Sequence, residues 1–131
     1  MRSPTYGELT FSQIAGKIAS YIMAHGLDRQ YELSVGTDSQ NFDDTKMVCV
    51  VTLHDVGHGG IFFYDVRRMR KIMNVREKLT VETTYSLDCA QQLLDAAEAF
   101  KDAFGFDITK YVHFSIHVDA GAFGAAYVTN N

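Results

Sequence analysis

Proline is almost absent from this sequence, and tryptophan is absent altogether. With one proline, no glycine-serine tract and no repeated segment, the 131 residues contain nothing typical of a linker between domains. Since 47% of the residues are hydrophobic, we expect the chain to fold around a core rather than remain disordered. The length is that of one domain. We therefore expect a single domain over residues 1–131, with residues 1–28 as an N-terminal helical extension.

Long hydrophobic runs are lacking as well. The longest strongly apolar run, residues 47–53, is far shorter than the roughly 20 residues needed to cross a bilayer. The first six residues lack the apolar stretch of a signal peptide. The two cysteines, Cys49 and Cys89, lie far apart and match neither a zinc-binding spacing nor a redox pair. We therefore expect no membrane partner, a cytoplasmic location and two reduced, buried thiols.

The sequence also lacks an excess of positive charge. The net charge of -4 argues against unspecific binding of nucleic acid through bulk charge. The basic residues are nevertheless concentrated in one part of the chain, and half of them are Arg67, Arg68, Arg70, Lys71, Arg76 and Lys78. Such a cluster can hold a phosphate backbone, and it is equally typical of a solvated connection between two elements.

Hydrophobic periodicity predicts the order of the elements. Apolar residues at helical spacing predict a helix over 12–24, ended by Gly26, and a longer helix over 75–104, followed by Gly105. Alternating or apolar stretches predict four strands, at 31–37, 47–54, 61–66 and 111–118. Short turns make the first three strands an antiparallel meander, and the long helix is a crossover that makes the fourth strand parallel to the first. The sequence therefore predicts an α/β fold with a mixed sheet.

Two aspartates end the two strands that are predicted to be parallel. Asp38 follows the polar side of the first strand, and Asp119 follows that of the fourth. Ligands gather beyond the carboxyl ends of such strands, and two carboxylates on one rim repel each other unless a proton or a cation lies between them. Mg2+ or Mn2+, which prefer oxygen ligands, is the natural bridge. Glu82 is the one charged residue in the helical stripe expected to face the sheet, so we expect the three acids to converge on a divalent-metal site.

Each acid also has an ordinary structural explanation. Asp38 lies in a Gly-Thr-Asp-Ser-Gln-Asn run that suits a turn, and Asp119 precedes Ala-Gly at a strand end. Glu82 lies in the first two turns of its helix, where the helix dipole favours acids. Each acid taken singly is more often structural, and it is their shared placement that favours a site.

Histidine is a weaker candidate for the same chemistry. His117 lies two residues before Asp119 and is a further candidate ligand. His113 and His117 share a strand face, but four residues along a strand separate two side chains by about 13 Å. They are too far apart to share one ion, so a zinc site is not expected.

Three motifs in this chain resemble those of the YkuK family, which is described as predicted ribonuclease H-like nucleases. They are Gly36-Thr37-Asp38-Ser39-Gln40, then Arg76-Glu77-Lys78-Leu79 with Glu82, Ser86 and Leu87, and His117-Val118-Asp119 with Gly121 and Gly124. The resemblance covers residues from about 30 to 125. It implies a ribonuclease H-like sheet whose acids, here Asp38, Glu82 and Asp119, bind divalent metal and activate water against a phosphodiester.

The segment after Asp119 departs from that family. Relatives usually continue into a further helix that supplies a fourth ligand, and a threonine and a lysine usually follow the glycines that match Gly121 and Gly124. We therefore expect a ribonuclease H-like fold that lacks the usual C-terminal helix. An uncovered sheet face would favour self-association into a homo-oligomer.

The function expected on this basis is metal-dependent hydrolysis of phosphodiester bonds in nucleic acid, either DNA or RNA. Ser39 and Gln40 would hydrogen-bond substrate or orient the carboxylates. The basic residues expected to hold the substrate backbone are Arg67, Arg68, Arg70 and Lys71. Two alternatives stay open: a catalytically inactive ribonuclease H-like binding module, and a nucleotide phosphohydrolase, which the absence of a Gly-x-x-x-x-Gly-Lys loop disfavours.

Overall fold

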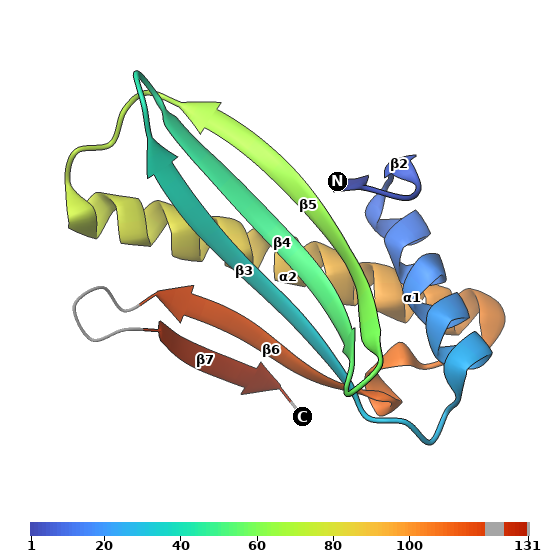
Figure 1. The fold of residues 1–131 in the computed structure, drawn as a ribbon. Helices are drawn as coiled ribbons and strands as arrows, with labels where there is room; N and C mark the ends of the chain where they lie inside the picture. Colours follow the sequence, from blue (N-terminus) through green and yellow to red (C-terminus); the bar gives the residue numbers. More distant parts are fainter. Residues whose placement is uncertain (120–124, 131) are drawn as a thin grey trace.

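The computed structural model describes the backbone of residues 1–119 and 125–130 and the side chains of residues 1–118. In this part of the chain, seven strands form one sheet in the order β2-β1-β5-β4-β3-β6-β7. The helix α2 crosses one face of the sheet, and α1 packs against α2 (Figure 1). None of the helices in the described residues is long and apolar enough to span a membrane.

The elements follow the predicted order. They are β1 (Arg2–Ser3), β2 (Gly7–Glu8), α1 (Phe11–His25), β3 (Tyr31–Asn41), β4 (Thr45–Asp55), β5 (Gly59–Met69), α2 (Val75–Phe104), the 3-10 helix η1 (Ile108–Lys110), β6 (Val112–Asp119) and β7 (Ala125–Asn130). The α/β class and the mixed sheet are confirmed. The short β1–β2 hairpin, which extends the sheet beyond β5, and β7, which pairs with β6, were not predicted.

The antiparallel meander and the parallel crossover are both confirmed. In the meander, β3 pairs with β4 from Tyr31↔Asp55 to Asn41↔Thr45, and β4 pairs in turn with β5. After α2 the chain returns as β6, which runs parallel to β3 from Tyr31↔Val112 to Gly36↔His117. The crossover helix α2 has the predicted bounds, with Asn74 capping its N-terminus and Gly105 in the left-handed conformation after its C-terminus.

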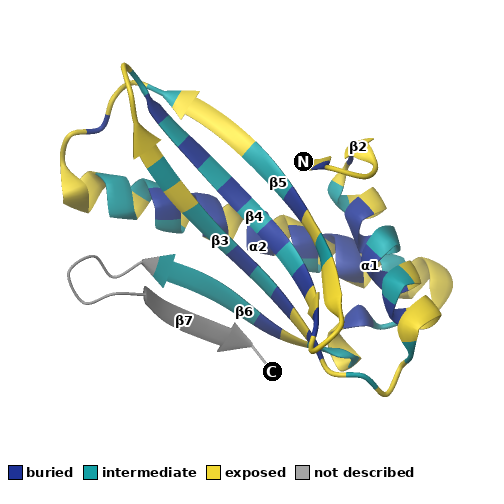
Figure 2. Ribbon diagram, in the orientation of Figure 1, coloured by how far each residue is buried: buried dark blue, intermediate teal, exposed yellow. Residues whose placement is uncertain are grey.

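The two faces of the sheet differ in burial. On β4, the residues buried toward the helices are Met47, Cys49, Val51 and Leu53, whereas the alternate residues from Lys46 to Thr52 are only partly buried (Figure 2). The buried apolar residues of α1, α2 and the sheet form one continuous core. We call the opposite face the open face. There the alternate side chains of β3, β4 and β5 point away from both helices. Any site that needs solvent access can therefore form on this open face.

Candidate functional site

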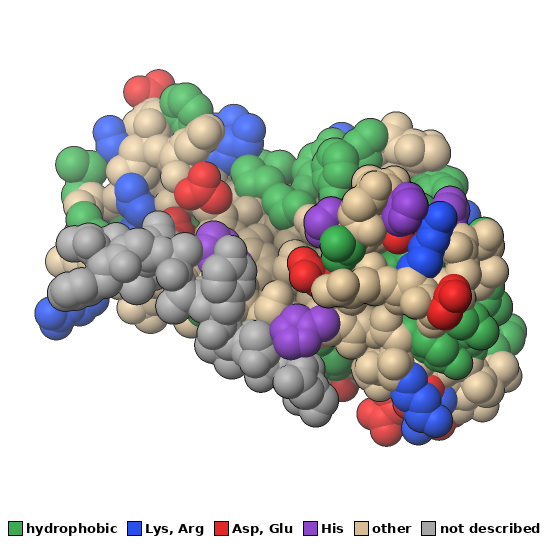
Figure 3. All heavy atoms as spheres, turned by 60° about the horizontal axis from the view of Figure 1, so that its bottom comes forward, with side chains coloured by type: hydrophobic (Ala, Val, Ile, Leu, Met, Phe, Trp, Pro, Cys, Tyr) green, Lys and Arg blue, Asp and Glu red, His purple; other side chains and the backbone are tan. Residues whose placement is uncertain are grey.

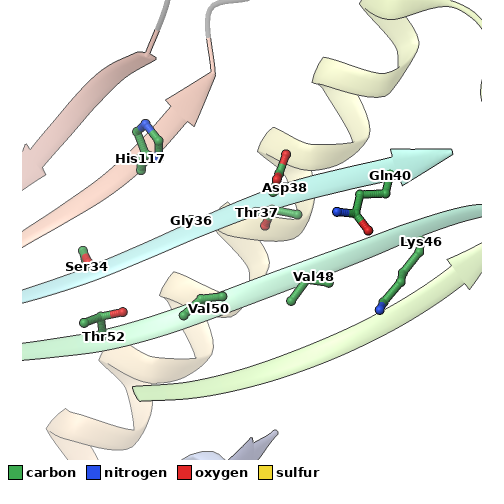
Figure 4. Close-up of a pocket in the computed structure, with 10 residues that line it drawn as sticks. All are labelled: Ser34, Gly36, Thr37, Asp38, Gln40, Lys46, Val48, Val50, Thr52 and His117. Atoms are coloured by element: carbon green, nitrogen blue, oxygen red, sulfur yellow. The ribbon is translucent and has the colours of Figure 1, made fainter. Parts of the chain in front are cut away.

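A pocket of about 840 Å³ hollows the open face above β3 and β4. Its lining residues are Ser34, Gly36, Thr37, Asp38, Gln40, Lys46, Val48, Val50, Thr52 and His117 (Figure 4). Strand pairing explains why they lie together. Asp38 is opposite Val48, Gln40 is opposite Lys46, and Gly36 lies between Val50 and His117. The pocket therefore contains a carboxylate, an amide, an ammonium group and an imidazole above an apolar floor.

The position of Asp38 relative to β6 fits the expected location of a ligand site. The parallel pairing of β3 with β6 runs as far as Gly36 and His117, so Asp38 lies just past the last paired residue. Crevices beyond the carboxyl ends of parallel strands are where open α/β sheets bind ligands. The Asp38 side chain is exposed, and its Oδ1 accepts a hydrogen bond from the backbone N–H of Ser39 at 2.9 Å. Its carboxylate is therefore both oriented and accessible.

Gly36 allows the His117 side chain to lie over β3. A Cβ added at Gly36 would be 3.2 Å from His117 Cβ, which is closer than most side-chain contacts, and 3.5 Å from Nδ1, which is an ordinary contact. The absence of a side chain at this position thus lets His117 lie close to β3 without displacement. His117 was only a secondary candidate in the sequence, because its approach to Gly36 depends on the register between two distant strands.

Glu82 lies on the other side of the sheet. Its side chain is buried on the inner face of α2, where Oε1 accepts a hydrogen bond from the hydroxyl of Ser39. One turn later, Ser86 Oγ lies 2.7 Å from Thr37 Oγ1. Asp38 and Glu82 therefore lie on opposite faces of β3, and the convergence of the three acids on one ion stays a prediction. The two acids are separated because β3 continues to Asn41 instead of ending at residue 37, and the strict alternation of a strand turns Asp38 outward.

The third predicted acid, Asp119, is the last residue of β6, where its backbone pairs with Ala125. Its side chain lies outside the described residues, so its predicted partnership with Asp38 stays a prediction. Within the part of the chain that the structure describes, no three acidic, histidine or cysteine side chains form a metal-binding group. Of the pocket residues, Asp38 has a carboxylate oxygen and His117 a ring nitrogen, the two kinds of atom that could bind an ion there.

The basic cluster does not form one surface. The Arg67 guanidinium lies 4.0 Å from the centre of the Tyr85 ring and within 4 Å of the carboxylates of Asp65 and Asp88, on the helix side. Arg68 points to the open face, where it pairs with Asp44 at 3.0 Å. Arg70 and Lys71 are exposed in the segment after β5. Acidic and basic side chains are also interspersed on the face seen in Figure 3.

Lys46 is the pocket cation that the sequence reasoning missed. It lies on β4 between Gln40 and Arg68, and it belongs to the partly buried alternate positions of that strand. The predicted second strand begins at residue 47 and so leaves out Lys46, which the structure includes in β4. Alternation of Lys46 with Val48 and Val50 is the signal that identifies its face.

Beneath the pocket, polar groups line the contact between α2 and the sheet. The Tyr85 hydroxyl donates a hydrogen bond to Asp65 Oδ2 at 2.5 Å, and burial together with this carboxylate raises the pKa of Tyr85. The predicted burial of both thiols is confirmed, but Cys49 and Cys89 lie together. Their interaction raises the pKa of the Cys89 thiol and lowers that of the Cys49 thiol.

Comparisons with known proteins agree with this architecture. The profile described as Ribonuclease H-like matches residues 13–129 of the chain. The chain is also 30% identical over 126 residues to the uncharacterized protein YkuK of Bacillus subtilis (strain 168), and the match covers 89% of this chain and 70% of that protein. No solved structure matches the chain significantly.

Proposed function

Because this chain belongs to the ribonuclease H-like family, we propose that it hydrolyses phosphodiester bonds in nucleic acid with a divalent metal ion bound at the open-face pocket. The observation that supports this best is the place of Asp38. Its exposed carboxylate lies in a pocket just past the end of the β3–β6 pairing, together with Lys46 and His117. A carboxylate, a cation and an imidazole are the groups that phosphodiester hydrolysis uses.

The donor set fits Mg2+ or Mn2+ if Asp119 joins Asp38. Asp38 Oδ1 is engaged by the Ser39 N–H, and a carboxylate has further lone pairs available for an ion. When bound, such an ion lowers the pKa of an attacking water and stabilises the leaving oxygen. His117 is the second protein ligand or the group that takes a proton from water. Two described donors are fewer than a hard cation prefers, so the proposal depends on Asp119.

Substrate contacts come from the other polar residues of the pocket. Lys46 attracts a phosphate of the substrate backbone, and Gln40 donates an amide hydrogen bond to a phosphate or sugar oxygen. Ser39 acts indirectly, because its backbone orients Asp38 while its hydroxyl is engaged by Glu82. Ser39 is thus a positioning residue in this proposal.

A second candidate function is nucleic-acid binding without cleavage. The observation that favours it is the separation of Asp38 from Glu82, because the Glu82 carboxyl group is buried on the opposite side of β3. A site that lacks the helix acid has fewer ligands for an ion. In this case the pocket would hold a nucleic-acid backbone through Lys46 and Gln40 and would cut nothing.

Calorimetric titration with Mg2+ and Mn2+ tests the proposal, followed by cleavage assays on labelled DNA and RNA. We expect metal binding by the unaltered chain, loss of both binding and cleavage in Asp38→Asn and in the Asp38→Asn, Asp119→Asn double variant, and no loss in Asp43→Asn. Asp43 is an exposed acid of the β3–β4 turn and serves as the matched control. Metal affinity or cleavage that survives in Asp38→Asn overturns the proposal. Nucleic-acid binding without cleavage by the unaltered chain establishes the second candidate.

A further inference from the structure

The open face carries two aromatic side chains next to the pocket. On β5, Phe62 is paired with Thr52 and Tyr64 with Val50, and both of these partners line the pocket. Phe62 is 47% exposed, a large exposed fraction for an aromatic side chain on a strand. The two ring centres lie 6.5 Å apart. The rings therefore continue the floor of the pocket outward along the sheet as an apolar platform.

Cations flank this platform. Arg68 lies four residues after Tyr64 on β5, so both side chains are on the same face, and Arg68 is paired with Lys46 of β4. Arg2 of β1 is paired directly with Tyr64. Arg2 and Arg68 form ion pairs with Glu8 and Asp44 at the surface, where such pairs contribute little energy and exchange readily. An aromatic surface with cations at its borders complements a ligand that has flat apolar groups joined by phosphates.

The layout of the sheet relates the platform to the candidate catalytic residue. Tyr64 and Asp38 lie on strands separated by one strand, β4, so about 10 Å separates their strands. A chain of nucleotides lying across the sheet can thus reach both groups. In a duplex the bases are stacked inside and do not reach such rings, whereas the bases of a single strand stack on exposed aromatic side chains.

We propose that the open face binds single-stranded nucleic acid, with bases stacked on Phe62 and Tyr64 and the phosphates held by Lys46 and Arg68. This inference rests on the proposed function, since it names the substrate class of the same pocket. The bound single-stranded nucleic acid runs from Phe62 and Tyr64, over Val50 and Val48, to Asp38. Single-stranded segments are then the substrate, and a duplex is not.

Fluorescence anisotropy with labelled oligonucleotides of DNA and of RNA tests the inference, with chelator present so that cleavage does not interfere. We expect single strands to bind at least about tenfold more tightly than the matching duplex. Base stacking contributes ~1–3 kcal/mol per base, so Phe62→Ala and Tyr64→Ala should each weaken binding by at least about fivefold. Phe104→Ala, at an exposed aromatic residue on α2, is the control and should leave binding unchanged. Equal affinity for duplex, or unchanged affinity in both platform variants, overturns the inference.

Two further measurements distinguish base stacking from lost packing and from self-association of the chain. Phe62→Leu retains an apolar side chain but removes the ring, so weakened binding in this variant shows stacking rather than lost packing. Sedimentation of the free protein tests whether the face is covered by a second copy of the chain. A dimer that Phe62→Ala dissociates would overturn the inference in favour of self-association.

The inference and the proposed function can fail separately. Single-strand binding that needs Phe62, without cleavage of any substrate by the unaltered chain, supports the inference and refutes hydrolysis. Metal-dependent cleavage of duplex alone, unaffected by Phe62→Ala, supports hydrolysis and refutes the single-strand path.

Discussion

The hydroxyl of Ser39 donates a hydrogen bond to Oε1 of Glu82, and this bond ties β3 to the buried side of α2. The backbone N–H of the same serine donates to Asp38 Oδ1 at 2.9 Å on the opposite face. One residue thus connects a buried carboxylate beneath the sheet to an exposed carboxylate above it. The orientation of the candidate catalytic group depends on the contact between the sheet and the crossover helix.

Ser39→Ala should lower the free energy of unfolding by ~1–3 kcal/mol. The substitution removes a hydrogen-bond donor from the buried Glu82 carboxyl group, and a buried polar group that loses a partner is destabilised by its lost solvation. Urea unfolding measures the change. Ser20→Ala, on the exposed side of α1, should stay within about 0.5 kcal/mol of the unaltered chain. Equal stability of the two variants would contradict the role assigned to Ser39.

Arg29→Ala should be among the more destabilising surface-accessible substitutions. Arg29 Nη1 lies 2.8 Å from Oδ2 of Asp55, which is fully buried at the end of β4 and also accepts a hydrogen bond from Tyr21. Removing the cation leaves a buried charge, and we expect a loss of about 3 kcal/mol, the low end for such cases, because Arg29 is partly exposed.

The matched control for Arg29 is Arg68→Ala, which breaks the exposed ion pair with Asp44. Exposed pairs contribute less than about 1 kcal/mol. Chemical denaturation of both variants in parallel measures the difference. Similar losses for the two arginines would mean that Asp55 does not depend on its cation.

Gly60→Ala should disrupt the β4–β5 hairpin. Gly60 has a φ of +153°, and a Cβ at this position would overlap the carbonyl oxygen of Leu53 in the neighbouring strand. Gly57, in the turn that precedes β5, also has a positive φ, of +82°, but a Cβ there meets nothing within 4 Å. Thermal unfolding should therefore show a much larger loss for Gly60→Ala than the ~1–2 kcal/mol expected for Gly57→Ala. Comparable losses would show that backbone conformation alone, and not the close contact, fixes the turn.

Stability should fall as the pH rises above about 10, the pKa of an unfolded tyrosine. Burial raises the pKa of Tyr85, Tyr31 and Tyr21 in the folded chain. A raised folded pKa contributes stability that is complete below the unfolded pKa and is lost as the pH rises toward the folded pKa. Urea unfolding at a series of alkaline pH values measures the slope. Tyr85→Phe should flatten it, and Tyr6→Phe, at an exposed position, should not.

The two thiols should react together and only on unfolding. Cys49 of β4 and Cys89 of α2 are nearly inaccessible, and their thiols interact where the helix contacts the sheet. A colourless aromatic disulfide reagent that releases a coloured thiolate measures their reaction. We expect slow modification of the native protein and rapid modification of both thiols in denaturant. Fast modification of one thiol in the native state would show that α2 opens locally from the sheet.

The ends of α2 could be predicted because local chemistry determines them. Asn74 caps the first turn through the N–H of Glu77, and Gly105 adopts the left-handed conformation that ends a helix. The end of β3 could not be predicted in this way. Its polar segment from Thr37 to Asn41 has the composition of a turn, but pairing with β4 continues through it.

Because the end of β3 depends on pairing with β4, the sequence predicts only part of the site. Asp38 and Gln40 were candidates from the sequence, and both line the pocket. Their partners Lys46 and His117 depend on the registers of β3 with β4 and with β6, which only the folded sheet defines. Glu82 was correctly placed on the inner side of α2, and the extra strand length of β3 is what separates it from Asp38.

The strand pairing also has a consequence for how the chain folds. The β3–β4–β5 meander consists of contacts between neighbours in the sequence, which form quickly because little loop entropy is lost. Pairing of Tyr31 with Val112 closes a loop that includes the whole of α2, so β6 should join late. Until then, the backbone of β3 has one unpaired edge. At that stage another partly folded chain can add at the same edge, and synthesis at high concentration should favour aggregates held together through β3.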